Sequence, residues 1–129
     1  MGRIKKAVLL IEDNPLLTDL YSIGLRKKGL EVIVVHNGED GLKAIEQYDP
    51  DIVLLDLSMP GMSGVEVLKK IRSDPKTKDT KVIILTMSEK EEDRIRAEEL
   101  GVSDYLLKMD THLDEIISKV LKHLDLSLK

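Results

Sequence analysis

The chain has 129 residues, which suits one domain, and 42% of them are hydrophobic, so a folded core is expected. The absence of cysteine excludes a disulfide framework and a thiolate metal site. The formal net charge of −4 argues against nucleic acid as a direct partner. No apolar run approaches the ~18 residues of a membrane span, and the N-terminus lacks the apolar segment of a signal peptide, so a cytoplasmic protein without membrane contact is expected.

Short runs of branched apolar residues recur through the chain and predict strands that are buried on both faces. Turn and helix-capping residues such as Asn-Pro, Asp-Pro and Pro-Gly flank these runs and limit their length. The predicted strands are residues 7–11, 31–35, 52–55, 82–85 and 103–107.

A helical pattern follows each predicted strand. Asn14 and Pro15 are a typical N-cap and first helical residue, and Ser63 and Glu66 stand at capping-box spacing. The predicted helices are residues 15–28, 38–48, 64–73, 89–100 and 111–124.

The last two helices differ in what they can bury. Helix 89–100 has a thin apolar stripe, so we expect it to be held loosely. This stripe consists of Ile95, Ala97 and Leu100. Helix 111–124, for which Thr111 and Asp114 are the expected cap, has the clearest i, i+3, i+4 apolar pattern in the chain.

Strands and helices alternate five times, without a linker, repeat or low-complexity segment. Such alternation predicts an α/β fold with a doubly wound parallel sheet, because a β/α barrel needs eight units. We expect one domain over residues 1–129, with a core at about 6–124 and no effector domain after Leu124.

Side chains that can bind ligands or react stand at the carboxyl ends of four predicted strands. The first strand is followed by Glu12 and Asp13, the third by Asp56, the fourth by Thr86 and the fifth by Lys108. Each alone has a structural explanation, as a helix-terminal charge, a cap or a solvated lysine. Because these strand ends share one edge of a parallel sheet, where ligands bind in open α/β folds, we expect a common site.

The predicted site has the groups that phosphoryl transfer requires. Three close carboxylates repel one another unless a pKa rises or a cation binds. Oxygen ligands alone select a hard cation, and Mg²⁺ suits one or two carboxylates together with a phosphate oxygen. Lysine adds a positive charge for phosphate, and an aspartate in such a setting can act as the nucleophile. The pattern therefore predicts phosphoryl transfer onto Asp56.

The residues that form this site also carry a family resemblance. Glu12-Asp13, the segment Asp-Leu-Ser-Met-Pro-Gly-Met-Ser-Gly at 56–64, Thr86 and Tyr-Leu-Leu-Lys at 105–108 resemble the receiver domain of two-component response regulators, in particular single-domain chemotaxis receivers. The resemblance covers about residues 6–124. It implies a flavodoxin-like (βα)5 fold with strand order 2-1-3-4-5.

The resemblance also implies the metal ligands. Asp56 would be the phosphoacceptor and a ligand of Mg²⁺, with Mn²⁺ as the alternative ion. Asp13 would bind the ion directly, Ser58 through its backbone carbonyl and Glu12 through a water molecule.

The same resemblance implies how the signal leaves the site. Lys108 would pair with the phosphoryl group, Thr86 would donate a hydrogen bond to it, and Tyr105 would be the switch residue that moves inward with Thr86. Phosphorylation would change a protein-docking surface. This surface comprises helix 89–100, strand 103–107 and helix 111–124.

The implied partners are a histidine kinase or phosphotransfer protein as donor and a downstream effector protein. The protein would be a monomer that could dimerise on phosphorylation. We expect no separate substrate, because phosphorylation and dephosphorylation would be self-catalysed. The chain could also be the receiver portion of a hybrid kinase or multidomain regulator, or a phosphorylation-independent binding module.

Two positions depart from the family's pattern. Met109 stands where proline usually follows the lysine, in a peptide bond that is commonly cis. A cis bond before a non-proline residue costs ~3 kcal/mol, so either the site holds that strain or this loop differs, which leaves the placement of Lys108 open. Met87 stands where a small residue is usual, and we expect it to narrow access to Asp56 and slow phosphoryl donation or hydrolysis.

Two other protein classes share part of the pattern. A phosphatase of the haloacid dehalogenase type also uses an aspartate after a strand, but it carries a second aspartate where this chain has Ser58, and it is larger. A flavodoxin-like FMN binder would need a Ser/Thr/Gly-rich loop after the first strand and aromatic rings to stack on the flavin. Here the loop is Glu-Asp-Asn-Pro, and the chain has three Tyr and no Trp or Phe.

Overall fold

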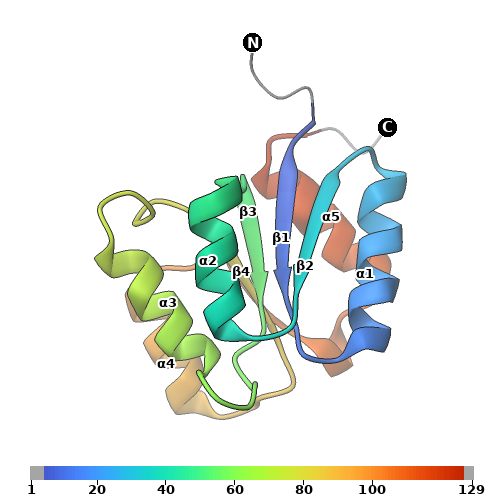
Figure 1. Cartoon of the computed structure of the whole chain (residues 1–129). Coiled ribbons are helices and arrows are strands. Elements are labelled where there is room, and N and C mark those ends of the chain that lie inside the picture. Colours follow the sequence, from blue (N-terminus) through green and yellow to red (C-terminus); the bar gives the residue numbers. More distant parts are fainter. Residues whose placement is uncertain (1–4, 127–129) are drawn as a thin grey trace.

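The computed structural model describes residues 5–126 (Figure 1). Residues 1–4 and 127–129, which the one-domain expectation also includes, lie outside the described part of the chain. Within the described part, no helix has the length and apolar character needed to cross a membrane. The elements, in chain order, are β1 (Ala7–Ile11), α1 (Pro15–Lys27), β2 (Glu31–Val35), α2 (Gly38–Tyr48), β3 (Ile52–Leu55), α3 (Gly64–Ser73), β4 (Lys81–Thr86), α4 (Glu91–Leu100), β5 (Asp104–Leu107), the 3-10 turn η1 (Lys108–Asp110) and α5 (Leu113–His123).

The five strands form one parallel sheet in the order β2-β1-β3-β4-β5, so the predicted α/β fold and strand order are confirmed (Figure 1). The register aligns the carboxyl ends of the strands in two neighbouring pairs, β1 with β3 and β4 with β5. Ile11 at the end of β1 pairs with Leu55 at the end of β3, and Thr86 at the end of β4 pairs with Leu107 at the end of β5. The residues that follow these strands therefore emerge at the same edge of the sheet.

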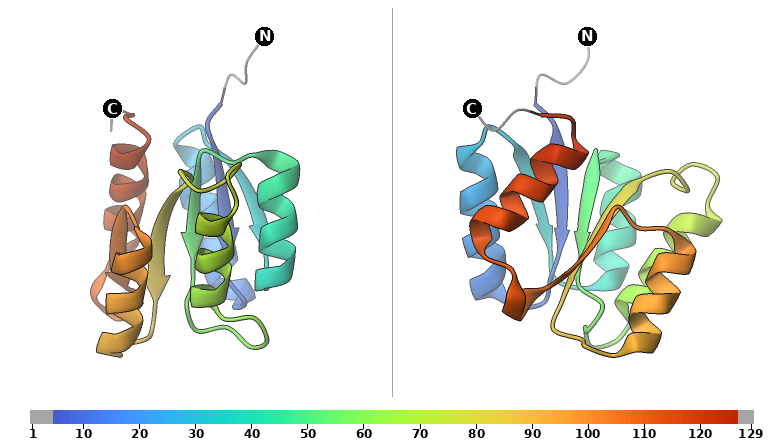
Figure 2. Two further views of the ribbon diagram at one scale, coloured as in Figure 1. Left: turned by 90° about the vertical axis from the view of Figure 1, so that its left-hand side faces the viewer. Right: turned by 180° about the vertical axis from the view of Figure 1, so that it is seen from behind.

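Helices cover both faces of the sheet, which explains why the strands are apolar without alternation (Figure 2). Val8 and Leu10 of β1 face a core that α1 and α5 complete, whereas Leu9 and Ile11 face a second core that α2, α3 and α4 complete. All four of these side chains are at most 2% exposed. The sheet is therefore a rigid base for the residues at its carboxyl edge.

The close approach of α1 and α5 depends on a glycine. A Cβ atom built on Gly24 would lie 2.8 Å from Cδ1 of Ile117 and 3.5 Å from both terminal carbons of Leu113. A larger residue at position 24 would therefore push α5 away from α1.

Two predicted helix caps are confirmed. Asn14 accepts the backbone N–H of Leu16 at 3.0 Å at the start of α1. At the start of α3, the Ser63 hydroxyl accepts the N–H of Glu66, and the Glu66 carboxylate accepts the N–H of Ser63, which is a capping box.

The predicted cap of α5 is wrong. The N-cap is His112 instead of Thr111, and Thr111 donates its hydroxyl hydrogen to the carbonyl of Leu107 at 2.8 Å. The difference arises because η1 inserts a 3-10 turn after β5, and the Thr111 hydroxyl closes this turn. Helix α5 therefore begins at Leu113, two residues later than predicted.

Helix α4 differs from its prediction at its start and in its packing. It begins at Glu91 rather than at residue 89, because residues 88–90 form a loop in which the Ser88 hydroxyl oxygen accepts the N–H of Lys90. Ala97 is the only buried residue among the described positions 91–100, whereas Ile95 is 47% exposed, so the predicted contribution of Ile95 to the buried stripe is wrong. Strand β5 likewise begins at Asp104 instead of residue 103.

Candidate functional site

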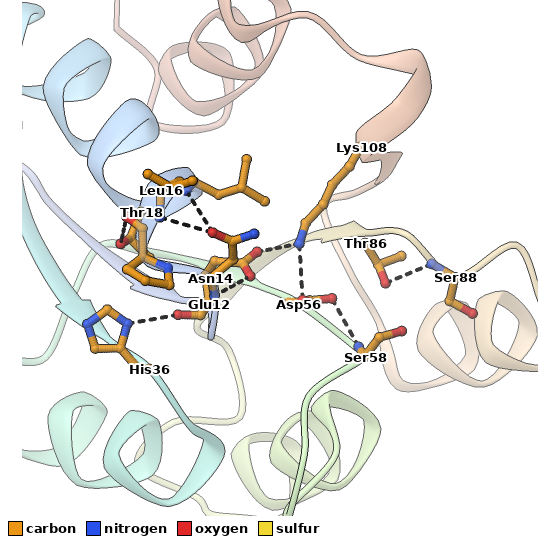
Figure 3. A network of polar contacts seen from close by, with 12 residues as sticks. Glu12, Asn14, Leu16, Thr18, His36, Asp56, Ser58, Thr86, Ser88 and Lys108 are labelled. Carbon is orange, nitrogen blue, oxygen red and sulfur yellow. Dashed lines mark hydrogen bonds and ion pairs between the residues drawn. The ribbon is translucent and has the colours of Figure 1, made fainter.

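Four loops meet at the carboxyl edge of the sheet, and each brings one part of the predicted site (Figure 3). Glu12 directly follows β1 and Asp56 directly follows β3, and the Asp56 N–H donates to the carbonyl of Ile11 at 3.1 Å. This hydrogen bond extends the β1–β3 ladder by one residue and fixes the two acids side by side. Lys108 enters from the end of β5 and Thr86 from the end of β4.

Three carboxylates form a compact cluster at this edge. One oxygen each from Glu12, Asp13 and Asp56 lie within 4.8 Å of one another. Glu12 is 2% exposed and Asp56 4% exposed, while Asp13 faces solvent. An all-oxygen donor set that is buried on one side and open on the other fits a hard divalent cation that keeps part of its water.

The ammonium group of Lys108 bridges the two buried acids. Its Nζ lies 3.1 Å from Oδ2 of Asp56 and forms a short ion pair with Oε1 of Glu12, and the lysine side chain is 7% exposed. Burial alone would lower the pKa of Lys108, but the hydrogen bond and charge of Glu12 and the charge of Asp56 outweigh it and raise the pKa. The lysine is therefore a fixed positive charge.

The substitution of methionine for proline after this lysine leaves Lys108 in reach of Asp56. The peptide between Lys108 and Met109 is trans, and both residues belong to the 3-10 turn η1. The Met109 side chain is 77% exposed, so it lies outside the carboxylate cluster. Of the two expected outcomes, the structure has the altered loop.

Glu12 is held by its own backbone neighbours as well as by Lys108. The N–H of Asn14 donates to Oε2 of Glu12 at 3.0 Å, and a ring nitrogen of His36 lies 3.1 Å from the Glu12 carbonyl. Burial raises the pKa of the Glu12 carboxyl, and the charge of Asp56 acts in the same direction, against the effects of Lys108 and Asn14. The sequence pattern did not identify His36, because its contact depends on how the loop after β2 passes Glu12.

The loop after β3 folds tightly around Asp56. The N–H of Ser58 donates to Oδ1 of Asp56 at 3.0 Å, so each carboxylate oxygen has a partner, Ser58 on one side and Lys108 on the other. A Cβ atom on Gly64 would lie 2.3 Å from the Asp56 carbonyl oxygen. Only glycine lets the start of α3 approach the backbone of Asp56 this closely.

The two predicted switch residues lie on neighbouring strands. Thr86 is fully buried, and its hydroxyl oxygen accepts the N–H of Ser88 at 3.1 Å (Figure 3). The Tyr105 hydroxyl is buried and has no hydrogen-bond partner among residues 5–126. The guanidinium carbon of Arg94 on α4 lies 5.7 Å from the centre of the Tyr105 ring, which is cation–π range.

A comparison with known protein families identifies the family of this chain. The family model of the response regulator receiver domain matches residues 8–121. The chain belongs to the response regulator receiver family. Its sheet order and its acidic cluster are those expected for a receiver of a two-component system.

Relatives of this receiver include both short and long proteins. It is 35% identical over 103 residues to protein PilH of Pseudomonas aeruginosa, covering 78% of this chain and 84% of PilH. It is 41% identical over 102 residues to the sensory transduction protein RegX3 of Mycolicibacterium smegmatis, covering 79% of this chain and 43% of RegX3. The receiver thus spans less than half the length of RegX3.

Solved structures have the same fold as this receiver. The Mn²⁺-bound form of the response regulator Rcp1 matches with a TM-score of 0.80 and 30% identity, covering 96% of each chain.

Proposed function

We propose that this receiver accepts a phosphoryl group on Asp56 from a phosphohistidine of a histidine kinase or phosphotransfer protein. A carboxylate oxygen of Asp56 forms a bond to phosphorus while the bond from phosphorus to the imidazole nitrogen breaks. The electron pair of the broken bond stays with the imidazole, and the product is an aspartyl phosphate. The observation that carries the proposal is the buried Asp56 carboxylate between two further acids and the Lys108 ammonium.

The acidic cluster supports Mg²⁺, with Mn²⁺ as the alternative ion. Asp13 and Asp56 would be direct ligands, Ser58 would contribute its backbone carbonyl, and Glu12 would act through water. The three carboxylates outnumber the single ammonium by two, which matches a divalent cation. A bound Mg²⁺ supplies charge neutralisation for the phosphoryl oxygens. The Mn²⁺-bound form of Rcp1 supports this assignment.

Lys108 and Thr86 would contact the transferred group. Lys108 lies 3.1 Å from Oδ2 of Asp56, so its ammonium is within reach of phosphoryl oxygens attached there. The hydroxyl oxygen of Thr86 accepts the Ser88 N–H, which leaves the hydroxyl hydrogen available for a phosphoryl oxygen. These two donors would stabilise the charge on the transferred group from two different strands.

Phosphorylation would alter a docking surface formed by α4, β5 and α5. The aspartyl phosphate carries about −1.5 to −2 charge at a buried site where the carboxylate carried −1. Thr86 and Tyr105 would carry this change to α4, which has little buried area of its own. The readout would be docking of an effector protein by the monomer or a phosphorylation-dependent dimer. That the receiver spans 43% of RegX3 also supports a role within a longer regulator.

The test is the mass of the intact protein after incubation with acetyl phosphate and Mg²⁺. We expect one added phosphoryl group, which is lost without Mg²⁺ and in the Asp56→Asn variant. A Glu46→Gln variant, which changes an exposed acid on α2, is the matched control and should be phosphorylated normally. Absence of the adduct in the unmodified protein, which is the chain without any substitution, would contradict the proposal. An adduct that persists in Asp56→Asn would also contradict it.

A further inference from the structure

One residue, Ser88, contacts both the buried end of β4 and the first turn of α4. Its N–H donates to Oγ1 of Thr86 at 3.1 Å, and its own hydroxyl donates to Oδ2 of Asp93 at 2.7 Å. The Ser88 oxygen also accepts the N–H of Lys90 at 3.3 Å. Ser88 therefore joins the proposed phosphoryl contact Thr86 to a charged residue of α4 within two hydrogen bonds.

The N-terminal end of α4 has few other attachments. Its N-cap residue, Lys90, makes no side-chain capping bond within the described residues, and Ala97, the buried residue of the helix, lies near the opposite end. That opposite end is fixed, because Arg72 donates hydrogen bonds to the carbonyls of Leu100 and Gly101 at 2.8 to 3.2 Å. Helix α4 is thus anchored at its C-terminal end, and Ser88 provides the polar attachment at its N-terminal end.

We infer that the hydrogen bond between Ser88 and Asp93 is a latch that couples the Thr86 hydroxyl to the position of α4. This inference rests on the proposed phosphorylation of Asp56. When the whole Thr86 side chain moves towards Asp56 to donate its hydroxyl hydrogen to a phosphoryl oxygen, its oxygen leaves the Ser88 N–H. The loop at 87–90 then shifts, the hydroxyl of Ser88 withdraws from Asp93, and the first turn of α4 is released.

The same turn of α4 also contacts Tyr105. Arg94, the residue after Asp93, lies over the Tyr105 ring. Burial raises the pKa of Tyr105, and the Asp93 carboxylate is the next largest cause, so this charge acts on the tyrosine hydroxyl. Because that hydroxyl lacks a partner within residues 5–126, a movement of α4 that supplies an acceptor is favoured. Release of the latch therefore changes the surroundings of the predicted switch residue.

Linkage gives the latch a measurable consequence. If binding at Asp56 must break the latch, a protein without the latch binds more tightly, because coupling between two sites is reciprocal. The probe is beryllofluoride with Mg²⁺, a phosphoryl mimic, titrated against the full chain and followed by NMR. Loss of the Ser88–Asp93 hydrogen bond, which both substitutions remove, predicts about three- to tenfold tighter binding by Ser88→Ala and by Asp93→Ala.

Controls separate the latch from a general loss of structure. Ser88→Thr keeps a hydroxyl and should bind like the unmodified protein. Glu92→Ala removes an exposed acid from the same helical turn and should also leave the affinity unchanged. The double variant Ser88→Ala/Asp93→Ala should bind no more tightly than either single variant, because both remove the same bond.

Hydrogen exchange of the first-turn amides of α4 gives a second readout. In the unmodified protein, beryllofluoride should speed their exchange, whereas in both latch variants exchange should already be fast and change less than twofold on binding. Unchanged beryllofluoride affinity in Ser88→Ala and Asp93→Ala would overturn the latch while leaving the proposed function intact. Failure of the unmodified protein to bind beryllofluoride at Asp56 would overturn the proposed function itself.

Discussion

Lys108 places its ammonium nitrogen 3.1 Å from Oδ2 of Asp56, although the two residues are 52 positions apart in the chain. The contact depends on the order of the strands, since β5 and β3 flank β4 in the sheet. The lysine reaches across the end of β4 and also pairs with Glu12 from β1. One cation thus joins the ends of three strands.

Replacement of this lysine should slow phosphorylation. In Lys108→Met, the rate of labelling by acetyl phosphate should fall about 100-fold, because a positioned donor to the transferred group is lost. Intact-protein mass against time measures the rate. Lys122→Met, which removes an exposed lysine from α5, is the matched control and should keep its rate. A rate within twofold of the unmodified protein in Lys108→Met would contradict the assigned role.

Mg²⁺ should stabilise the receiver against unfolding through the acidic cluster. At a Mg²⁺ concentration of about 100 times Kd, the free energy of unfolding should rise by about 2.7 kcal/mol, because the folded state alone has the clustered carboxylates. Thermal unfolding with and without Mg²⁺ measures this gain. Asp13→Asn should lose most of the gain, whereas Asp19→Asn on the exposed surface of α1 should keep it. Equal stabilisation of both variants by Mg²⁺ would mean that the ion binds outside the acidic cluster.

The exposed methionine after Thr86 should limit access to the acceptor. Met87 is 53% exposed and directly follows the buried Thr86. We expect Met87→Ala to gain and lose its phosphoryl group faster, because the smaller side chain leaves more room for the donor and for water. The decay of the labelled protein measures this, with Met109→Ala as the control for loss of an exposed methionine. Slower decay in Met87→Ala than in the unmodified protein would refute the expectation.

Arg72 should contribute strongly to stability. Its guanidinium donates to the carbonyls of Lys78 and Thr80 in the loop before β4, and to those of Leu100 and Gly101 at the end of α4. Arg72→Met keeps the aliphatic stem but leaves these carbonyls without their charged donor, which should cost about 3 kcal/mol.

Urea unfolding measures the cost at position 72. Arg96→Met, at an exposed position of α4, is the control and should change the free energy of unfolding by about 0.5 kcal/mol or less. A similarly small change in Arg72→Met would show that water replaces the guanidinium without a loss of stability.

The attachment of α5 to β5 should weaken in acid. Burial alone would raise the pKa of Asp104, but the hydrogen bond from His123 at 3.0 Å and the charge of Lys119 outweigh it and lower the pKa. Because the folded pKa lies below the unfolded value of about 3.9, the carboxylate stabilises the fold above that pH. This stabilisation is lost as the pH falls through the folded pKa.

An Asp104→Asn variant tests the sign of this dependence. The unmodified protein should be more stable than the variant at pH 6, and the difference should shrink progressively below about pH 4. Thermal unfolding over this pH range measures the difference. Glu99→Gln, at an exposed position of α4, is the control. A difference that stays constant between pH 6 and pH 3 would be evidence against the Asp104 interaction.

The sequence predicted the sheet and the arrangement of the acidic cluster for a physical reason. Strands buried on both faces must be continuously apolar, so the first polar residue after each strand marks the sheet edge. Glu12, Asp56, Thr86 and Lys108 are such residues, or the last residue of their strand, and a parallel sheet gives their strand ends one common edge.

The parts that the sequence did not predict lie in loops and on helix surfaces. The cap of α5 was wrong because the turn after β5 uses Thr111 for its own hydrogen bond. The exposure of Ile95 depends on how α4 is rotated against its neighbours, which periodicity does not fix for a helix with so few apolar residues. The Ser88–Asp93 contact has a local signal, a serine shortly before an acidic helix start, but its link to Thr86 requires the folded loop.

We propose that Asp56 itself is the residue that receives the phosphoryl group. Reduction with borohydride after acetyl phosphate treatment converts an aspartyl phosphate into homoserine, and peptide mass spectrometry then locates the converted residue. We expect homoserine at position 56 only when Mg²⁺ and acetyl phosphate are both present. Homoserine at position 13, or an unconverted Asp56 in protein that carries the added phosphoryl group, would contradict it.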